Sequence, residues 1–109
     1  PELYRALANQ GADVLFVPAA FTQYTGEDHW EVLLRARAIE NTAFVIAPAQ
    51  CGLHFVKRRS FGHAMILDPW GAKLADAGEA PGFALAEIDP QRLSQVRSRM
   101  PSLEHQRLV

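Results

Sequence analysis

The apolar residues of this chain fall into short continuous runs and helically spaced stripes, and the two patterns predict different elements. Residues 13–17 and 43–47 are almost entirely apolar and each run is followed at once by a proline, which is typical of strands buried on both faces. Between them, residues 27–41 carry large apolar residues at helical spacing, with charged residues on the other side. The order strand, helix, strand predicts an α/β fold in which a crossover helix joins two neighbouring strands.

The flanking segments extend this pattern. Residues 1–10 predict a helix, because proline suits the first helical position and Gly11 is a natural stop. Residues 51–62 are polar and are predicted to form a loop. Three further strands are expected over residues 64–67, 72–75 and 83–88, with a tight turn at Asp68-Pro69-Trp70-Gly71. A last helix is expected to run to about residue 99, with Asp89 as its cap and Pro90 as its first residue.

These elements make an incomplete domain. Continuous apolar strands occur where both faces of a sheet are covered, and the predicted helices 1–10, 27–41 and 90–99 supply too little cover for that. The chain also begins at Pro1 rather than at a methionine, and it begins with a helix. We therefore expect the 109 residues to be a piece of a larger domain.

Composition narrows the class of protein. Hydrophobic residues make up 49% and charged residues 21%, the balance of an ordinary globular protein. The net charge is −1 and the densest basic stretch is residues 57–59, which we interpret as a solvated loop, so no nucleic-acid partner is expected. No apolar run approaches the ~20 residues that span a bilayer, so no membrane partner is expected. The single cysteine excludes an intramolecular disulfide and favours a reducing, cytoplasmic location.

Three stretches carry recognisable motifs in a fixed order. The first is residues 1–5 with the following strand, the second runs from Ala20-Phe21-Thr22 through His29-Trp30-Glu31 to Asn41, and the third joins Gln50-Cys51-Gly52 to Ser60-Phe61-Gly62-His63 and Asp68-Pro69-Trp70-Gly71. In order and spacing they resemble the nitrilase superfamily of carbon–nitrogen hydrolases, within it most closely the branch that acts on deaminated-glutathione-type amides and ω-amides. The resemblance covers nearly the whole chain, but only the closing part of a family domain.

The resemblance implies both a fold and a chemistry. The fold is α/β, the C-terminal portion of the nitrilase-type α-β-β-α sandwich, with residues 1–109 forming the C-terminal part of one domain. The chemistry is hydrolysis of a non-peptide C–N bond through a cysteine thioester, with a Glu general base and a Lys that stabilises the oxyanion. By the resemblance all three residues lie upstream of Pro1, the nucleophile just before the first helix. We therefore expect no catalytic residue, metal or cofactor in this chain, and no activity from it alone.

The loop that follows the first strand is the candidate substrate site. Ligand crevices in open α/β sheets form at the carboxyl ends of strands, and in the family this loop lines the pocket of a small amide substrate. Phe21 is the expected apolar wall and Thr25 the expected polar contact. The alternative is that the loop only shapes a turn and packs the core. The candidate substrate-binding residues are Ala19, Ala20, Phe21, Thr22 and Thr25.

A second surface is implied by the same resemblance. In the family the first helix and the helix that carries His29-Trp30-Glu31 form a dimer interface, and a self-complementary two-fold patch is the commonest way to cover such faces. A homodimer is therefore expected, and the alternative function is a non-catalytic dimerisation module built from this fold. The candidate interface residues are Tyr4, Arg5, Ala8, Arg35 and Arg37.

Cys51 offers a third hypothesis, an independent hydrolase that uses His54 or His63 as base. A nucleophilic thiol needs a lowered pKa, usually from a helix N-terminus or an adjacent protonated histidine. Cys51 instead follows a strand and enters a loop, which favours a structural thiol. Cys51 and His54 also lack the further ligands that a structural zinc site requires.

Overall fold

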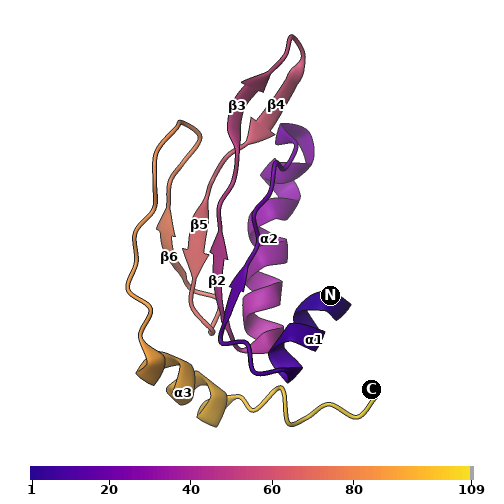
Figure 1. Cartoon of the computed structure of the whole chain (residues 1–109), viewed down its shortest axis with the longest axis vertical. Coiled ribbons are helices and arrows are strands. Elements are labelled where there is room, and N and C mark those ends of the chain that lie inside the picture. The colour runs from indigo at the N-terminus through magenta and orange to yellow at the C-terminus, as the bar shows by residue number, and fades with distance from the viewer. Residues whose placement is uncertain (109) are drawn as a thin grey trace.

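The computed structural model describes residues 1–108 and arranges them around a four-stranded mixed sheet (Figure 1). The sheet order is β1 (Val14–Phe16), β2 (Phe44–Ala47), β5 (Met65–Leu67) and β6 (Lys73–Asp76). β1 and β2 are parallel neighbours with Val14 opposite Phe44, and the other two strand pairs are antiparallel. The predicted pair of adjacent strands joined by a crossover helix is confirmed, as is the α/β class.

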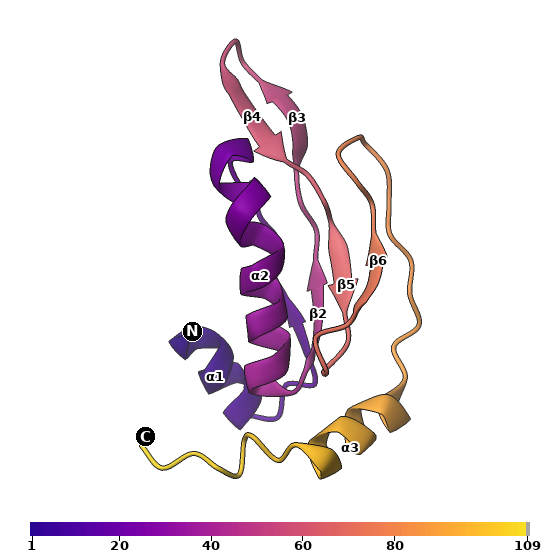
Figure 2. The same ribbon diagram turned by 180° about the vertical axis from the view of Figure 1, so that it is seen from behind.

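The long helix α2 (Gln23–Asn41) covers one face of this sheet (Figure 2). Every second strand residue points toward α2, as the period of a strand requires, and meets the apolar side of the helix. Trp30 and Leu34 are each only 2% exposed. The buried residues of this core are Leu15, Trp30, Leu34, Ala38, Ala43, Val45, Ala47, Met65 and Leu67.

α2 begins at Gln23, four residues before the predicted start at residue 27. Gly26 lies inside its first turns and is buried. A β-carbon at Gly26 would lie 2.5 Å from the Phe61 β-carbon, so only glycine lets Phe61 approach the helix this closely. The glycine is therefore a packing residue within the helix, and the pattern of the sequence alone does not distinguish this from a helix start.

The segment predicted as a polar loop over residues 51–62 is instead a β-hairpin. β3 (Cys51–His54) and β4 (Arg58–Phe61) pair antiparallel and project from the end of the sheet beside the start of α2 (Figure 1). The hairpin turn holds Phe55 at a φ of 57°. Glycine and asparagine usually occupy such positions, so the turn carried no signal that would have revealed the hairpin.

The strand predicted over residues 83–88 is also wrong. Phe83 and Leu85 are exposed while Ala84, Ala86 and Ile88 are half-buried, so the alternation of a strand is present. No ladder hydrogen bonds join this segment to another strand within the described chain. Alternation reports an extended backbone with one covered face, and it carries no information about whether a partner strand exists.

Two helices lie beside the end of the sheet where β1 and β2 begin. α1 (Glu2–Asn9) packs on the last turns of α2, and Arg5 donates hydrogen bonds to the Asn41 side chain over 3.1 Å and to the Glu40 carbonyl oxygen over 2.9 Å. α3 (Pro90–Arg99) begins at the predicted cap, because the Asp89 carboxylate accepts a hydrogen bond from the Gln91 N–H. None of the helices in residues 1–108 is both long and apolar enough to cross a bilayer.

Candidate functional site

The candidate substrate loop extends the parallel pairing of β1 and β2. The Ala19 N–H donates to the Pro48 carbonyl oxygen over 3.0 Å, and the Gln50 N–H donates to the Ala19 carbonyl oxygen over 2.9 Å. Ala19 and Ala49 form a parallel bridge beyond the ends of both strands. The loop is therefore held at the carboxyl edge of the sheet, as the sequence predicted.

The hairpin β3–β4 holds the other side of this loop. The Phe61 N–H donates to the Phe21 carbonyl oxygen over 2.8 Å, and Thr22 forms an antiparallel bridge with Ser60. The Phe21 ring lies 5.3 Å from the Trp30 ring and packs against the core. Backbone hydrogen bonds on two sides of the loop and the contact between the Phe21 and Trp30 rings give the loop a defined shape.

The five candidate residues divide by exposure. Ala20 and Thr22 are exposed, whereas Ala19, Phe21 and Thr25 are half-buried. The Thr25 hydroxyl donates only a long hydrogen bond of 3.4 Å, to the Thr22 carbonyl oxygen, and so retains capacity for another partner. Phe21 and Thr25 thus contact the rest of the chain and also keep part of their surface exposed to solvent. Contact with a substrate stays a prediction for all five.

Trp30 is a packing residue of the core. It is almost fully buried, and its indole N–H donates to the His63 carbonyl oxygen over 2.9 Å. This bond ties α2 to the segment that leads into β5. Trp30 therefore supports the Phe21 ring from below and stabilises the position of the loop indirectly.

Cys51 does not form the Cys-His pair of the third hypothesis. His54 lies three residues further along β3, so its side chain points to the opposite face of the hairpin from the thiol. His54 Nε2 pairs with the Ser60 hydroxyl at 2.8 Å, and His63 Nδ1 pairs with Asp76 at 3.0 Å. The Cys51 thiol is free and half-buried, and its β-carbon packs against the backbone of Gly62. The structural interpretation of this cysteine fits these contacts.

Asp76 organises a polar cluster beside the base of the hairpin. Burial raises the pKa of its carboxyl, but hydrogen bonds from the Gly78 N–H, Lys73 and His63 outweigh burial and hold that pKa below its ordinary value of 3.8. The hydrogen bond to Glu31 raises the pKa of Lys73 above 10.5. The His63 ring also stacks on Phe61 with 4.4 Å between centroids. The cluster thereby connects the sheet edge to the hairpin.

No group of three or more His, Cys, Asp and Glu side chains within residues 1–108 is arranged to hold a metal ion. Asp76, Lys73 and His63 do lie together, and there the Asp76 carboxylate pairs with Lys73 Nζ at 3.2 Å and with His63 Nδ1 at 3.0 Å.

The candidate interface residues make contacts within the chain. The Arg37 guanidinium lies 5.8 Å from the centre of the Tyr4 ring and pairs with Glu40, and Arg35 Nε donates to the Gly71 carbonyl oxygen over 2.9 Å. Ala8 is 5% exposed and belongs to the interior of this chain. Tyr4, Arg5, Arg35 and Arg37 lie on neighbouring turns of α1 and α2. A two-fold interface through these residues stays a prediction.

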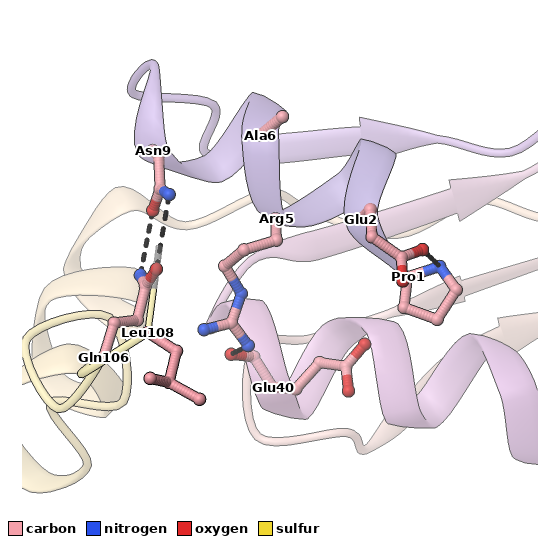
Figure 3. Close-up of a pocket in the computed structure, with 8 residues that line it drawn as sticks. All are labelled: Pro1, Glu2, Arg5, Ala6, Asn9, Glu40, Gln106 and Leu108. Atoms are coloured by element: carbon pink, nitrogen blue, oxygen red, sulfur yellow. Dashed lines mark hydrogen bonds and ion pairs between the residues drawn. The ribbon is translucent and has the colours of Figure 1, made fainter.

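A cavity of about 450 Å³ lies between α1, the end of α2 and the C-terminal tail (Figure 3). Arg5 is among the residues that line it, and so are Asn9 and Gln106, whose side chains exchange two hydrogen bonds of 2.9 and 3.3 Å. This cavity lies at the C-terminal end of α2, whereas the candidate substrate loop leads into the N-terminal end of the same helix. The two are separate features.

Comparison with known proteins decides the family. The family model described as carbon-nitrogen hydrolase matches residues 1–98. The chain belongs to the carbon–nitrogen hydrolase family. A deaminated glutathione amidase of Synechocystis sp. (strain PCC 6803 / GT-S) is 71% identical over 109 residues, which are 100% of this chain and 40% of that protein. The Homo sapiens deaminated glutathione amidase is 53% identical over 107 residues, covering 98% of this chain and 33% of that protein.

Solved structures of nitrilase-superfamily proteins give the same result for the fold. The C. elegans NitFhit protein superimposes with a TM-score of 0.94 at 48% identity, covering 98% of this chain and 26% of that chain. A mutant of the Nesterenkonia sp. AN1 amidase, in which acrylamide has added to the active-site cysteine, gives a TM-score of 0.72 at 28% identity and covers 93% of this chain and 39% of that chain. The predicted superfamily and α/β class are confirmed, and this carbon–nitrogen hydrolase chain spans less than half of each of these relatives.

Proposed function

We propose that the protein containing this chain is an amidase that hydrolyses a non-peptide C–N bond of a small linear amide of the deaminated-glutathione type. The observation that carries the proposal is the 71% identity, along the whole chain, with a deaminated glutathione amidase. The loop from Ala19 to Thr25 supports it, because its backbone is held at the carboxyl edge of a parallel strand pair.

The proposed chemistry uses a cysteine thiolate that lies upstream of Pro1. The thiolate attacks the amide carbonyl, the amine departs with a proton, and water hydrolyses the resulting thioester to a carboxylate. An upstream Glu acts as general base and an upstream Lys stabilises the oxyanion. The related Nesterenkonia amidase has an active-site cysteine, and the two histidines considered as a base for Cys51 pair with Ser60 and Asp76 instead. Both observations favour an upstream nucleophile.

The position of α1 constrains where that nucleophile lies. Tyr4 packs beside Arg37, which is fourteen residues after Gln23 along α2. Fourteen residues of helix span about 21 Å, and an extended chain covers that distance with about six residues. A nucleophile that acts at the Phe21 loop therefore requires about six residues or more between it and α1.

The role of this chain is to shape the pocket. Phe21 supplies an apolar wall that excludes water from the thioester, and Thr22 and Thr25 supply hydroxyls that orient the amide. A homodimer through α1 and α2 and a cytoplasmic location complete the proposal. Both rest on the resemblance and the composition of the chain.

The test compares two proteins. Residues 1–109 alone are expected to show no amidase turnover, whereas the same chain extended upstream through its Cys, Lys and Glu is expected to hydrolyse deaminated glutathione. Replacing the upstream Cys with Ala is expected to abolish the reaction, and Cys51→Ala is expected to leave it unchanged. Turnover by the 109-residue chain that survives Cys51→Ala would contradict the proposal.

A second candidate function is a non-catalytic dimerisation module. The observation that favours it is the apolar outer surface of α2, where Val32 is 65% and Leu33 is 42% exposed. Size-exclusion chromatography of the 109-residue chain with a full-length homologue tests this function. Co-elution supports it, and separate elution of the two proteins contradicts it.

A further inference from the structure

We propose that the groove between the β3–β4 hairpin and the start of α2 binds a carboxylate of the amide substrate, at a point away from the bond that is cleaved. This inference rests on the proposed function and deepens it. It predicts that the enzyme prefers linear amides that carry an anionic group away from the cleaved bond. The cationic residues of the groove, Lys57, Arg58 and Arg59, take no part in the proposed cysteine chemistry.

The groove has a volume of about 480 Å³, and its lining includes three consecutive cationic residues. Lys57, Arg58 and Arg59 come from the turn and first residues of β4. Thr22, Gln23 and Glu27 come from the start of α2 and form the opposite side. A concave surface between two elements that is lined by three cationic residues has the chemistry to recognise an anion.

These cations differ from most other basic side chains of the described chain. Arg5, Arg35 and Arg97 donate hydrogen bonds to carbonyl oxygens of distant elements. Lys73 and Arg92 form ion pairs with carboxylates. Among residues 1–108, Lys57, Arg58 and Arg59 make no ion pair and no side-chain hydrogen bond. Their donors are therefore available to a ligand.

The opposite wall does not neutralise this charge. Glu27 is the acidic residue of the groove, and its carboxylate already accepts a hydrogen bond of 2.6 Å from the Gln23 side chain. Thr22 is the N-cap of α2 but makes no side-chain capping bond, so the positive end of the helix dipole adds to the cations. The groove carries three positive charges against one negative charge.

The groove is continuous with the candidate substrate loop. Thr22 belongs to both, and its bridge with Ser60 joins the loop directly to β4. A ligand that extends from the Phe21 loop past Thr22 therefore enters the groove. Deaminated glutathione keeps both carboxylates of glutathione, so one can lie over these cations while the amide lies at the reaction centre. A short amide without a distal carboxylate gains nothing from them.

The experiment uses the full-length protein with two compounds, deaminated glutathione and its analogue in which the glycine carboxylate is an N-methylamide. The test variant is Arg58→Gln with Arg59→Gln. The matched control is Arg99→Gln with Arg107→Gln, which removes the same charge from exposed positions at the end of α3 and in the segment that follows it. Arg58→Lys with Arg59→Lys keeps the charge and is expected to retain most of the affinity.

The test variant is expected to raise KM for deaminated glutathione about tenfold, with kcat nearly unchanged and with no effect on the N-methylamide. The difference between the two compounds is expected to shrink at high salt, because exposed charges are screened. Equal KM values for the two compounds, or an equal effect of the control variant, would overturn the inference while leaving the amidase function intact.

If neither compound is hydrolysed, the proposed function fails, and calorimetric titration with the same two compounds still decides the groove. Preferential binding of the carboxylate compound that is lost in Arg58→Gln with Arg59→Gln supports the inference. Absence of binding, or equal binding of both compounds, overturns it.

Discussion

The Phe61 N–H donates a 2.8 Å hydrogen bond to the Phe21 carbonyl oxygen and thereby joins the hairpin to the loop that follows β1. These residues are forty positions apart in the chain, and the sequence alone gives no sign that they meet. The shape of the candidate substrate loop depends on this contact. Substitutions outside the loop that displace Phe61 are therefore expected to change the conformation of the loop.

Gly26→Ala provides such a change. The added β-carbon would lie 2.5 Å from the Phe61 β-carbon and 2.6 Å from its Cγ, so the hairpin has to move away from α2. We expect the free energy of unfolding to fall by about 1–3 kcal/mol, the usual cost of overpacking, as measured by urea denaturation. Gly82→Ala is the matched control, since its β-carbon would meet nothing closer than 3.9 Å. Equal stability of the two variants would contradict the close contact.

Asp68→Ala is expected to loosen the turn between β5 and β6. The buried carboxylate accepts hydrogen bonds from the Trp70 and Ala72 N–H groups over 3.0 and 2.8 Å and pairs with Arg92 of α3 over 3.0 Å. Its loss leaves two backbone donors without their partner, at an expected cost of about 2–4 kcal/mol in the free energy of unfolding. Asp28→Ala, at an exposed position, should change that free energy by less than about 0.5 kcal/mol.

Asp76 is expected to make stability depend on acid pH. Burial opposes ionisation of Asp76, but hydrogen bonds from Gly78, Lys73 and His63 outweigh it and lower the pKa in the folded chain below 3.8. A lowered folded pKa gives stability that is present above 3.8 and is lost as pH falls through the folded value. Urea denaturation from neutral pH down to about pH 2 should show this loss, and Asp76→Asn should show a shallower one. Identical slopes for the two proteins would contradict the role of Asp76.

Asp89→Ala is expected to weaken α3 at its first turn. The Asp89 carboxylate accepts a 2.9 Å hydrogen bond from the Gln91 N–H, which otherwise has no partner in the helix. The free energy of unfolding should fall by about 1 kcal/mol, and Asp89→Ser should restore most of it, because serine also caps helices. A Ser variant as unstable as the Ala variant would show that the cap is not the source of the effect.

Local rules succeeded where a residue's neighbours in sequence decide its structure. The Gly71 N–H donates to the Asp68 carbonyl oxygen over 2.9 Å, as the Asp-Pro-Trp-Gly turn predicted, and Asp89 caps α3 as predicted. Both depend on atoms within three residues of one another. The same rules failed at Phe55, whose positive φ is imposed by the pairing of β3 with β4 rather than by its own preference.

The α/β class, the parallel neighbours β1 and β2 and the crossover helix follow from the linear pattern of residues, because continuous apolar runs and helical spacing report burial directly. The family follows from the motifs of the sequence, through their resemblance to a known superfamily. Three features are revealed only by the structure. Residues 51–61 form a hairpin, Gly26 lies within α2, and residues 83–88 have no partner strand among the described residues. Each depends on contacts between segments distant along the chain. Pairing free energy and close packing between such segments outweigh local propensity, and a linear pattern does not contain them.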